Sequence, residues 1–498
     1  MKVALINPPY LLIYKKLNIK QDASIPLGLL YIAAVLERAG HKVKVFDPNL
    51  HNMPLFELIN EIKVFNPDLF GLTAVTPTFN AAQRITGELK INFPDIPIVM
   101  GGAHISALPE ESLELSPGVD FMVVGEGELT VVELVRLLED GRNDFSAVKG
   151  ICYRDKNKVI LNPAREFIQD LDIIPYPAYH LLPIRKYAPS VVYRIREDST
   201  FVMSSRGCPA TCTFCANEVT GRKLRAHSVD YFLGLIRHIV NVYCIRHLHI
   251  LDDNFMADQN RAVEICERII AEGLKITWFI FARTDHCQDI AVLKIMKKAG
   301  CVFIQFGIES GNVEVLRQLG KNVSKEAMLR ACMNCKKVGI DYLNSFMIGN
   351  PKDTRESILE TIQFAIKLDS IMAGFNILIP YPGTPIFRKY YQKDFERNTE
   401  WDKWNHITHD VPIDYRHTAL SKDEINALRK LAIRKFYLRP LQIFRILTFF
   451  RSFSLFLKFM GSSWKLLFFI FRGEQPEKNE KKAVSVNQSN KETRNEAY

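Results

Sequence analysis

SSRGCPATCTFCAN spans residues 204 to 217 and holds three of the chain's ten cysteines, Cys208, Cys212 and Cys215. Their spacing is Cys-x3-Cys-x2-Cys, with no fourth cysteine nearby. Three such thiolates are typical of an iron–sulfur cluster, whose irons take cysteine sulfur. Structural zinc is disfavoured because it needs four ligands, and a chance group of three buried thiols is the other alternative. A cluster held at three corners leaves one iron open for a reactive ligand.

The residues after this loop alternate apolar runs with helical patterns. A first strand precedes the loop, and further strands are predicted at HLHILDDNF, TWFIFART, CVFIQFGIES, YLNSFMIGNP and GFNILIPYPGTP. Helical spacing separates them, over residues 229–242, 261–272, 290–299, 325–338 and 355–368. Six βα units of this length predict a partial (β/α)6 barrel of the TIM type over residues 201–395.

Polar side chains come directly after five of these apolar runs. In chain order they are Asp252 and Asp253, Arg283 and Asp285, Glu309 and Ser310, Asn350, and Tyr381. The carboxyl ends of barrel strands share one rim, where barrel enzymes have their active sites. One charged residue there is usually a helix cap or a solvated loop residue. A set of them beside a three-cysteine loop predicts a functional site.

Residues 1–145 show a separate alternation that predicts a doubly wound parallel sheet. Its strands are KVALINPP, HKVKVFDPN, LFGLTAVT, PIVMGGAH and FMVVGEGE, and its helices cover 27–39, 55–65, 79–93, 110–115 and 129–138. Such sheets bind ligands at the carboxyl ends of their strands. Small or hydroxyl-bearing residues at those ends would let a bulky ligand approach the backbone, although these glycines could instead serve tight turns. No G-x-G-x-x-G follows the first strand, so a dinucleotide fingerprint is missing.

The remaining segments are a linker and a C-terminal region. Residues 146–200 are predicted to form a linker with a hairpin at GICYRDKNKVILN. Residues 396–472 are predicted to be helical, and one helix over 421–439 begins with a capping box of Ser421 and Glu424. The polar residues 473–498 are predicted to be disordered.

The C-terminal region also concentrates positive charge. The formal net charge is +10, and residues 425–472 contain ten Lys or Arg and no Asp or Glu. Arg451, Lys458, Lys465 and Arg472 recur every seven residues, so on a helix they form one narrow basic stripe among aromatic and aliphatic residues. This pattern favours peripheral membrane contact through residues 441–472, with packing against the barrel as the alternative. Nucleic acid is not expected as a partner, because the stripe lacks polar surroundings.

The N-terminus MKVALINPPY lacks the long apolar core of a secretory signal, which predicts a cytoplasmic protein, in contact with the inner face of the membrane if the basic segment binds it. Free cysteines are normal in that reducing compartment. Cys332 and Cys335 lie inside a predicted helix and are expected to be buried thiols, not a second cluster. Cys152 is expected to be structural. Four isolated cysteines are expected in the core: Cys244, Cys266, Cys287 and Cys301.

Several of these motifs resemble one known family. RGCPATCTFC resembles the cluster loop of radical S-adenosylmethionine enzymes, including the aromatic Phe214 just before the third cysteine. LDDNF, FGIESG and MIGNPKDTRES resemble later strand motifs of that superfamily. GGAH and VVGEGE resemble its cobalamin-binding subgroup, which includes magnesium-protoporphyrin ester cyclases and radical methyltransferases. The resemblance covers roughly residues 1 to 400 of this chain.

The resemblance implies three cofactors and their contacts. Cys208, Cys212 and Cys215 would hold a [4Fe–4S] cluster, whose open iron would chelate S-adenosylmethionine. One electron from an external reductant would cleave that molecule to a 5′-deoxyadenosyl radical. The implied contacts to S-adenosylmethionine are Phe214, Asp252, Asp253, Arg283, Glu309, Ser310 and Gly349. The implied contacts to cobalamin are Thr73, Thr76, Gly101, Gly102, Gly125, Glu126 and Gly127.

One feature departs from a related pattern. The Asp-x-His-x-x-Gly signature of proteins that ligate cobalt with histidine is absent, and His104 follows the wrong strand for that role. The resemblance therefore assigns no histidine of that motif to the lower face of cobalt. The resemblance also implies no catalytic residue other than those that bind the cofactors.

The resemblance implies methylation of an unactivated carbon in a small hydrophobic substrate, with a lipid, an isoprenoid or a tetrapyrrole favoured by the apolar C-terminus. One alternative is a radical oxidative cyclase or oxidoreductase acting on a tetrapyrrole or lipid. Another is a non-catalytic cobalamin-binding carrier or sensor, which the intact cysteine triad disfavours. A tRNA methylthiolating enzyme is disfavoured because no cysteine precedes Cys152.

Overall fold

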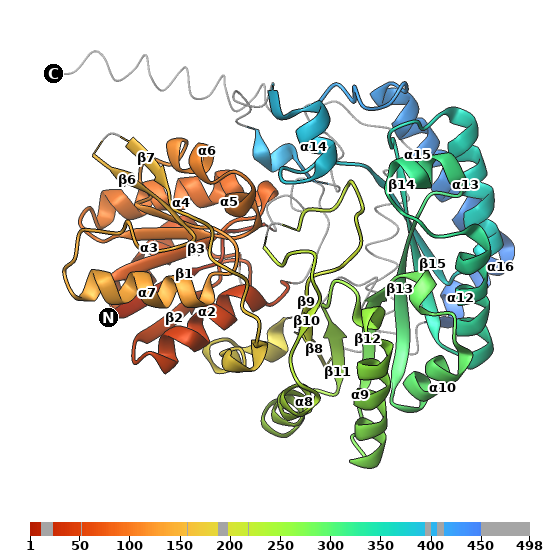
Figure 1. Cartoon of the computed structure of the whole chain (residues 1–498), viewed down its shortest axis with the longest axis horizontal. Coiled ribbons are helices and arrows are strands. Elements are labelled where there is room, and N and C mark those ends of the chain that lie inside the picture. Colours follow the sequence, from red (N-terminus) through yellow and green to blue (C-terminus); the bar gives the residue numbers. More distant parts are fainter. Residues whose placement is uncertain are drawn as a thin grey trace, which may run out of the picture. The chain divides into compact units, whose positions relative to one another are not determined.

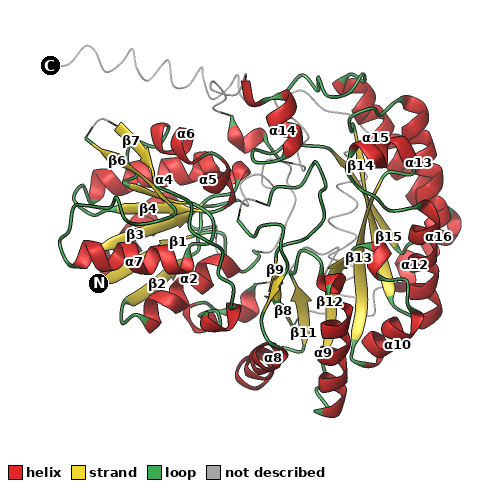
Figure 2. Cartoon of the chain, viewed as in Figure 1, coloured by secondary structure: helices red, strands yellow, loops and turns green. Residues whose placement is uncertain are grey.

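The computed structural model describes residues 1–10, 23–50, 52–156, 158–187, 198–217, 219–393, 400–405 and 413–449. Within these residues the chain forms two large sheets, each accompanied by helices, and one two-stranded ribbon. Figure 1 colours the chain along its sequence and labels the strands of both sheets, and Figure 2 colours helices, strands and loops separately. The predicted α/β class, with a doubly wound sheet followed by a partial barrel, is confirmed.

The first sheet has the order β2-β1-β3-β4-β5-β6-β7, and its first five strands in this order are parallel. Valine, leucine, phenylalanine and isoleucine dominate these strands, which suits a sheet buried on both faces. The parallel strands are β1 (Lys2–Ile6), β2 (Lys42–Phe46), β3 (Leu69–Thr73), β4 (Ile98–Gly101) and β5 (Phe121–Val123). The order reverses at β1, so a ligand site is expected beside its carboxyl end.

Helices cover both faces of this sheet. On one face α2 (Leu27–Arg38) packs beside α7 (Glu128–Glu139), and α3 (Leu55–Phe65) packs beside α4 (Phe79–Asn92) on the other (Figure 1). The short helices α5 (Ala103–Ala107) and α6 (Pro109–Glu114) join β4 to β5. These two layers enclose the sheet and leave its carboxyl edge for the site.

The hairpin predicted in the linker forms, but it belongs to the first sheet. β6 (Ile151–Asp155) pairs antiparallel with β5, and β7 (Lys158–Leu161) pairs antiparallel with β6. Cys152 is fully buried on β6. The sequence could not show this pairing. Its local pattern predicts a hairpin, and a hairpin has the same pattern whether or not it pairs with the edge of a sheet. The hairpin covers the edge that β5 would otherwise expose.

The second sheet is an open, fully parallel barrel sheet of order β15-β14-β13-β12-β11-β8. Its strands follow the predicted apolar runs closely. They are β8 (Ser199–Val202), β11 (His247–Ile250), β12 (Thr277–Ala282), β13 (Cys301–Glu309), β14 (Asp341–Ile348) and β15 (Met372–Ile377). A register shift between Gly307 and Glu309 bends β13 at its carboxyl end.

Helices alternate with these strands and begin at capping residues. Ser228 caps α8 (Val229–Tyr243) and Asp258 caps α9 (Gln259–Ala271), and each accepts a hydrogen bond from a backbone N–H of the first turn. The same holds for the helices that follow in the barrel. These are α10 (Ile290–Lys298), α11 (Val313–Gln318), α12 (Lys325–Val338) and α13 (Arg355–Leu368).

Three further helices follow the last barrel strand: α14 (Pro385–Tyr390), α15 (Lys422–Tyr437) and α16 (Pro440–Phe449). The predicted capping box of Ser421 and Glu424 starts α15. In the part of the chain that is described, no helix is long and apolar enough to cross a membrane. The predicted stripe of Arg451, Lys458, Lys465 and Arg472 and the tail 473–498 lie outside the described residues.

Candidate cofactor site at the cysteine loop

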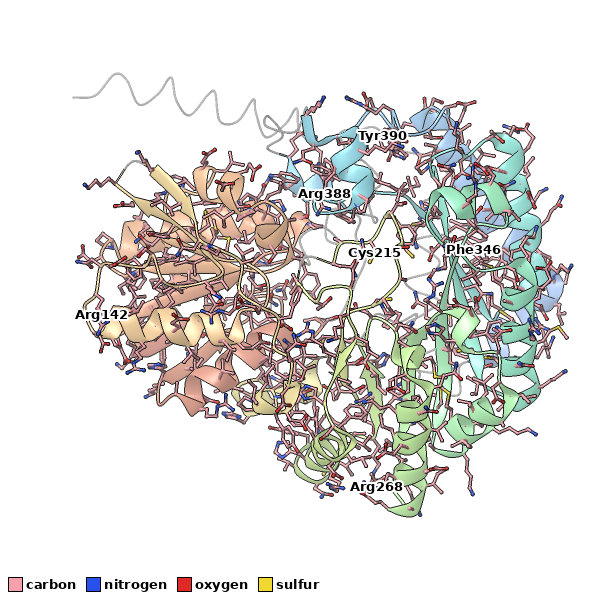
Figure 3. All side chains as sticks on the ribbon, viewed as in Figure 1. Arg142, Cys215, Arg268, Phe346, Arg388 and Tyr390 are labelled. Carbon is pink, nitrogen blue, oxygen red and sulfur yellow. The ribbon has the colours of Figure 1, made fainter. Side chains whose placement is uncertain are left out.

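The three-cysteine loop follows β8 and reaches across the carboxyl ends of the barrel strands. At its far end the N–H of Thr213 donates to the carbonyl of Leu319, and the carbonyl of Thr213 accepts from Ile386 N–H. Phe214 packs on an apolar cluster that includes Leu319 and Ile386. Figure 3 shows Cys215 on this loop, whereas Arg268 lies out on helix α9. Phe214 therefore anchors the loop to the barrel.

The start of the loop is fixed by Asp252, which lies after β11. Its carboxylate accepts four hydrogen bonds, from the backbone N–H and the hydroxyl of both Ser204 and Ser205, at 2.5–3.0 Å. Asp252 is 1% exposed, and burial raises the pKa of its carboxyl while the four donors oppose that rise. The oxygens of Asp252 thus hold the start of the loop, and its expected contact with S-adenosylmethionine stays a prediction.

Asp253 and Arg283 lie closer to the thiols. Asp253 is exposed, and its Oδ2 accepts from the N–H of Gly207 at 3.0 Å, directly before Cys208. The Nη1 of Arg283 lies 3.9 Å from the sulfur of Cys212, while its other nitrogens pair with both oxygens of Asp285. The structure thus brings one carboxylate and one guanidinium to the cysteines. These charges suit the amino and carboxylate groups of an amino-acid ligand.

Only glycine fits at position 207. Its φ is +85°, and a Cβ there would collide with the carbonyl oxygens of Lys223 and Thr220. The chain turns sharply at this point. Before the turn lies the two-stranded ribbon of β9 (Ser205–Arg206) and β10 (Arg225–Ala226), and after it comes Cys208. The glycine therefore sets the direction in which the cysteine loop departs.

The donor set of the loop fits an iron–sulfur cluster. Cys208 and Cys215 are partly exposed and Cys212 is 8% exposed, so ligands can reach the loop. Burial raises the pKa of Cys208 and raises that of Cys215 to about 11. Among the described residues, no three Cys, His, Asp or Glu side chains are already grouped closely enough to hold a metal ion. Because these pKa values are raised, cluster binding should release thiol protons.

The carboxyl end of β13 carries the predicted pair Glu309 and Ser310. Glu309 forms a buried ion pair with Lys321, with 2.9 Å between Oε1 and Nζ. Ser310 is fully buried, and its hydroxyl lies 3.0 Å from that of Thr361 on α13. Both side chains have partners within the protein, so their expected contact with S-adenosylmethionine stays a prediction.

The turn after β14 contains the predicted Gly349, whose carbonyl accepts from Nε2 of His417 at 2.7 Å. The carboxylate of Asp353 closes the same turn by accepting from the N–H of Asn350 at 2.8 Å and from the hydroxyl of Ser357. The C-terminal segment that holds His417 thus supports a turn at the rim of the barrel.

Asp353 predicts a pH dependence of stability. Burial raises the pKa of this carboxyl from 3.8 to about 6, so the folded protein binds its proton more tightly than the unfolded chain does. Stability from this group is therefore fully present below pH 4 and is lost as the pH rises to about 6. Between pH 5.0 and 7.5, we expect the free energy of unfolding of the wild type to fall by about 1.4 kcal/mol relative to Asp353→Asn. Denaturant unfolding of both proteins measures this difference, and an equal change in both would contradict it.

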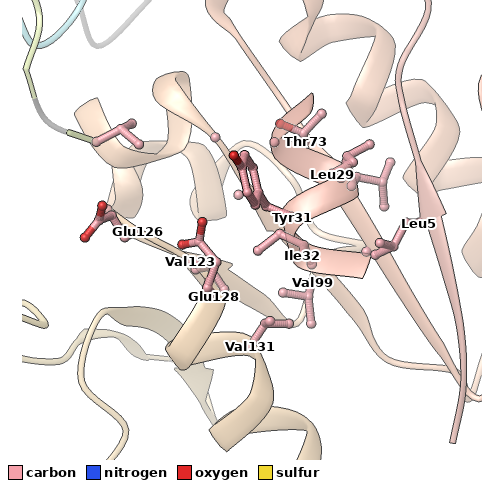
Figure 4. A pocket seen from close by; sticks show the side chains of 18 of the residues that line it. Leu5, Leu29, Tyr31, Ile32, Thr73, Val99, Val123, Glu126, Glu128 and Val131 are labelled. Carbon is pink, nitrogen blue, oxygen red and sulfur yellow. The ribbon is translucent and has the colours of Figure 1, made fainter. Parts of the chain in front are cut away.

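A second candidate cofactor site is a cavity at the carboxyl edge of the first sheet, bounded by α2 and α7. It encloses about 1040 Å³, counting the solvent at its mouth. Figure 4 shows aliphatic side chains of the sheet and helices in its wall, with the carboxyl groups of Glu126 and Glu128 beside them. Met203, Arg206, Val219 and Thr220, which flank the cysteine loop, complete its lining. The cavity therefore borders both ends of the cysteine loop.

Six of the seven residues expected to contact cobalamin line this cavity, namely Thr73, Gly101, Gly102, Gly125, Glu126 and Gly127. Gly102 has φ +108°, and a Cβ there would lie 2.6 Å from the carbonyl oxygen of Ala74. Thr76 is not among the lining residues. It is buried, and its hydroxyl lies 3.2 Å from Nδ1 of His104, which packs against Phe79 and Trp401. His104 is thus a core residue, in agreement with its exclusion as a cobalt ligand.

Sequence reasoning missed Tyr31, which lines the cavity from α2. Its side chain is 2% exposed, and its hydroxyl has no hydrogen-bond partner among the described residues. A buried hydroxyl without a partner is costly, so a bound molecule that accepts its hydrogen bond would stabilise the protein. Aliphatic walls, glycine-rich turns and this hydroxyl together fit a bulky ligand such as cobalamin. Only the apolar spacing of α2 marked this residue in the sequence.

The seven cysteines outside the loop are mostly buried, as expected. Cys332 and Cys335 lie inside α12, and burial raises the pKa of Cys332 to about 12. The same holds for Cys152 and Cys266, each with a pKa of about 12. The prediction for Cys244 is wrong, because this residue is exposed. It ends α8 in the left-handed conformation that closes many helices at the surface.

Comparisons with known proteins match both parts of the chain in which the candidate sites lie. A family model for the B12 binding domain matches residues 18–135, and one for the radical SAM superfamily matches residues 202–365. An uncharacterized methyltransferase of Pyrococcus horikoshii is 36% identical over 88% of this chain and 93% of its own length. The resemblance predicted from the cysteine loop and the N-terminal motifs is therefore confirmed.

Two further similarities cover most of the chain. An anaerobic magnesium-protoporphyrin IX monomethyl ester cyclase of Rubrivivax gelatinosus is 29% identical over 77% of this chain and 69% of its own length. A structure of the radical S-adenosylmethionine methyltransferase TsrM from Kitasatospora setae, with cobalamin and a [4Fe–4S] cluster bound, superposes with a TM-score of 0.65. That match has 18% identity and covers 79% of this chain and 78% of TsrM, so it supports the fold.

Proposed function

Since this chain belongs to the cobalamin-binding radical S-adenosylmethionine enzymes, we propose that it methylates an unactivated carbon of a small hydrophobic molecule. Its cofactors are a [4Fe–4S] cluster, S-adenosylmethionine and cobalamin. Together these supply an organic radical and a transferable methyl group. Methylation by this route needs the methyl donor and the source of the radical to lie close together. The supporting observation is that Met203 and Arg206, on one side of the cysteine loop, and Thr220, on the other, line the cavity of the first sheet.

The residues have distinct proposed roles. Cys208, Cys212 and Cys215 hold the cluster, and Asp253 and Arg283 bind the amino and carboxylate groups of S-adenosylmethionine. For cobalamin, the glycine-rich turns at the carboxyl ends of β4 and β5 let the ligand approach the backbone, as the sequence predicted. The aliphatic slot between sheet and helices suits its nucleotide tail. The domain limits 1–145 and 201–395 stay predictions, with the hairpin added to the first sheet.

The test uses protein reconstituted with iron, sulfide and hydroxocobalamin without oxygen, dithionite as the one-electron reductant, and S-adenosylmethionine with a deuterated methyl group. It is incubated with metabolite extract from a strain that lacks the gene. We expect a product that is heavier by one labelled methyl group, together with S-adenosylhomocysteine and 5′-deoxyadenosine. Products without label would overturn methylation.

The similarity to the cyclase favours one second candidate, an oxidative ring closure on a tetrapyrrole or lipid. This reaction removes hydrogen from the substrate, so its product would be lighter than the substrate and carry no label. A cobalamin-binding carrier or sensor would form no 5′-deoxyadenosine in the same experiment. The mass of the product and the fate of S-adenosylmethionine therefore separate the three functions.

Peripheral membrane contact is proposed for helix α16, because four of its apolar side chains, Leu441, Ile443, Phe444 and Leu447, are exposed. Its polar residues bind the barrel instead: Gln442 donates to the carbonyl of Ile371 at 2.6 Å, and Arg445 pairs with Asp369. Leu441 and Phe444 are 59% and 64% exposed. A helix that docks through its polar side presents an apolar strip, and the basic residues of 425–472 complement anionic headgroups.

Phe444→Ser tests this contact. We expect about tenfold weaker binding to vesicles of phosphatidylglycerol and phosphatidylcholine, because one buried phenylalanine contributes roughly 1.5–3 kcal/mol. Stability should change little, since the ring is exposed. Phe56→Ser is the matched control, because Phe56 is 70% exposed on α3. Equal vesicle binding by the two variants would rule out α16 as the contact.

A further inference from the structure

A buried group of charges joins the cobalamin cavity to the start of the cysteine loop. On the cavity side are Glu126, in the turn after β5, and Glu128, the first residue of α7. On the other side are Arg206 of β9 and Arg225 of β10. Two carboxylates and two guanidinium groups make this group neutral as a whole.

Arg206 is the residue that spans the two sites. Its Nη1 donates to Glu126 at 2.9 Å and its Nη2 donates to Glu128 at 2.6 Å. The side chains of all three residues are at most 8% exposed. Its guanidinium also lies 5.4 Å from the ring centre of Tyr31, the cavity residue whose hydroxyl has no partner. Only Gly207 separates Arg206 from Cys208.

Arg225 holds the second strand of the ribbon to the same carboxylate. Its Nη1 donates to both oxygens of Glu126 at 2.9 Å and to the carbonyl of Ile168 at 2.7 Å. The backbone N–H of Ile168 donates in turn to Glu126. Glu126 is therefore fully engaged inside the protein, although the sequence suggested it as a cobalamin contact. Glu128, in contrast, pairs with Arg206 alone among the described side chains.

The opposite side of the loop start is fixed by the barrel. Ser204 and Ser205 are bound by Asp252, and the N–H of Gly207 is bound by Asp253. Residues 204–207 thus lie between two sets of carboxylates, one from β11 and one from the wall of the cavity. If this short segment becomes more or less ordered, the residues of both cofactor sites are affected.

We propose that Arg206 is a positioning residue that couples the two cofactor sites, so that cobalamin in the cavity and the cluster on the cysteine loop each strengthen binding of the other. The inference rests on the proposed placement of cobalamin. A ligand in the cavity packs against Glu126, Glu128 and Arg206, which all line it, and so fixes the side chain of Arg206. A cluster on the loop fixes the backbone of Arg206 from the other side. When one cofactor is bound, residues 204–207 are already ordered, so the other cofactor binds with a smaller loss of conformational entropy. The effect is the same in both directions.

A double substitution isolates this link. Arg206→Met alone would leave Glu128 buried without a partner, which is strongly destabilising. Arg206→Met combined with Glu128→Leu removes one positive and one negative charge, and leaves the balanced pair of Arg225 and Glu126. Replacing a buried ion pair with neutral side chains of similar volume is often nearly neutral for stability. The double variant is therefore expected to fold.

The experiment measures the dissociation constant of hydroxocobalamin by anaerobic absorbance titration, before and after cluster reconstitution. In the wild type, we expect the cluster to tighten cobalamin binding at least about fivefold. In the double variant, both forms should bind cobalamin, with a ratio close to one. The reciprocal readout is the rate at which a chelator removes iron, which cobalamin should slow in the wild type only.

The matched control is Arg165→Met with Glu133→Gln, another ion pair that involves α7 but does not touch the cysteine loop. It should keep the wild-type ratio. A wild-type ratio of one, or the same ratio in the wild type and the Arg206 double variant, would overturn the coupling while leaving cobalamin binding intact. Absence of cobalamin binding in the wild type would overturn the proposed function itself, and this inference with it.

Discussion

Cys212→Ala is expected to lack the iron–sulfur absorbance after reconstitution and to form no 5′-deoxyadenosine from S-adenosylmethionine. Two remaining thiolates cannot hold three corners of the cluster, and Cys212 is the cysteine that lies 3.9 Å from Arg283. The side chain is small and 8% exposed, so the substitution should leave the fold intact. Iron content, visible absorbance and 5′-deoxyadenosine are measured on the same anaerobic sample.

The matched control is Cys244→Asn, which removes a cysteine at the exposed end of α8. Asparagine tolerates the left-handed conformation found there, with φ +55°. This variant should keep full iron content and cleavage. A Cys212→Ala protein that still cleaves S-adenosylmethionine at the wild-type rate would exclude the loop as the cluster site.

Val99→Phe is expected to weaken cobalamin binding by at least about tenfold, which corresponds to roughly 1.4 kcal/mol. Val99 lies on β4, is 4% exposed and lines the cavity. A phenyl ring there would occupy space that the nucleotide tail is proposed to fill. Absorbance titration with hydroxocobalamin measures the loss of affinity.

Overpacking itself costs about 1–3 kcal/mol of stability, so a control must share that cost. Val45→Phe provides it, because Val45 is 5% exposed on β2 of the same sheet but does not line the cavity. Its cobalamin affinity should match that of the wild type. If Val99→Phe also binds cobalamin as tightly as the wild type, the ligand lies elsewhere.

The sequence predicted the helices and strands well, because the spacing of apolar residues and the capping residues depend only on neighbouring positions in the chain. The helices expected over 55–65, 325–338 and 355–368 are α3, α12 and α13 with the same bounds. The place of the 151–161 hairpin was not predictable in the same way. Its pairing with β5 depends on which sheet edge is open, and that is a property of the assembled fold.

For the candidate site, the sequence predicted which residues gather but not which way they point. Asp252 and Asp253 are neighbours in one motif, yet Asp252 is buried under two serines and Asp253 is exposed beside Gly207. Adjacent residues at a strand end face opposite sides, so composition alone cannot separate them. The pairing of Glu126 with Arg206 was also hidden, because these residues are 80 positions apart.

The six buried cysteines outside the loop give the protein an unusual chemical selectivity. The thiolate is the nucleophile toward alkylating reagents, and burial both blocks access and disfavours that form in Cys152, Cys266 and Cys332. In the native protein, iodoacetamide should therefore react fastest with the exposed Cys244, and more slowly with Cys208 and Cys215, which are partly exposed but have raised pKa values. A bound cluster would protect the latter two while Cys244 still reacts. Peptide-level alkylation thus reports cluster occupancy, with Cys244 as the internal standard.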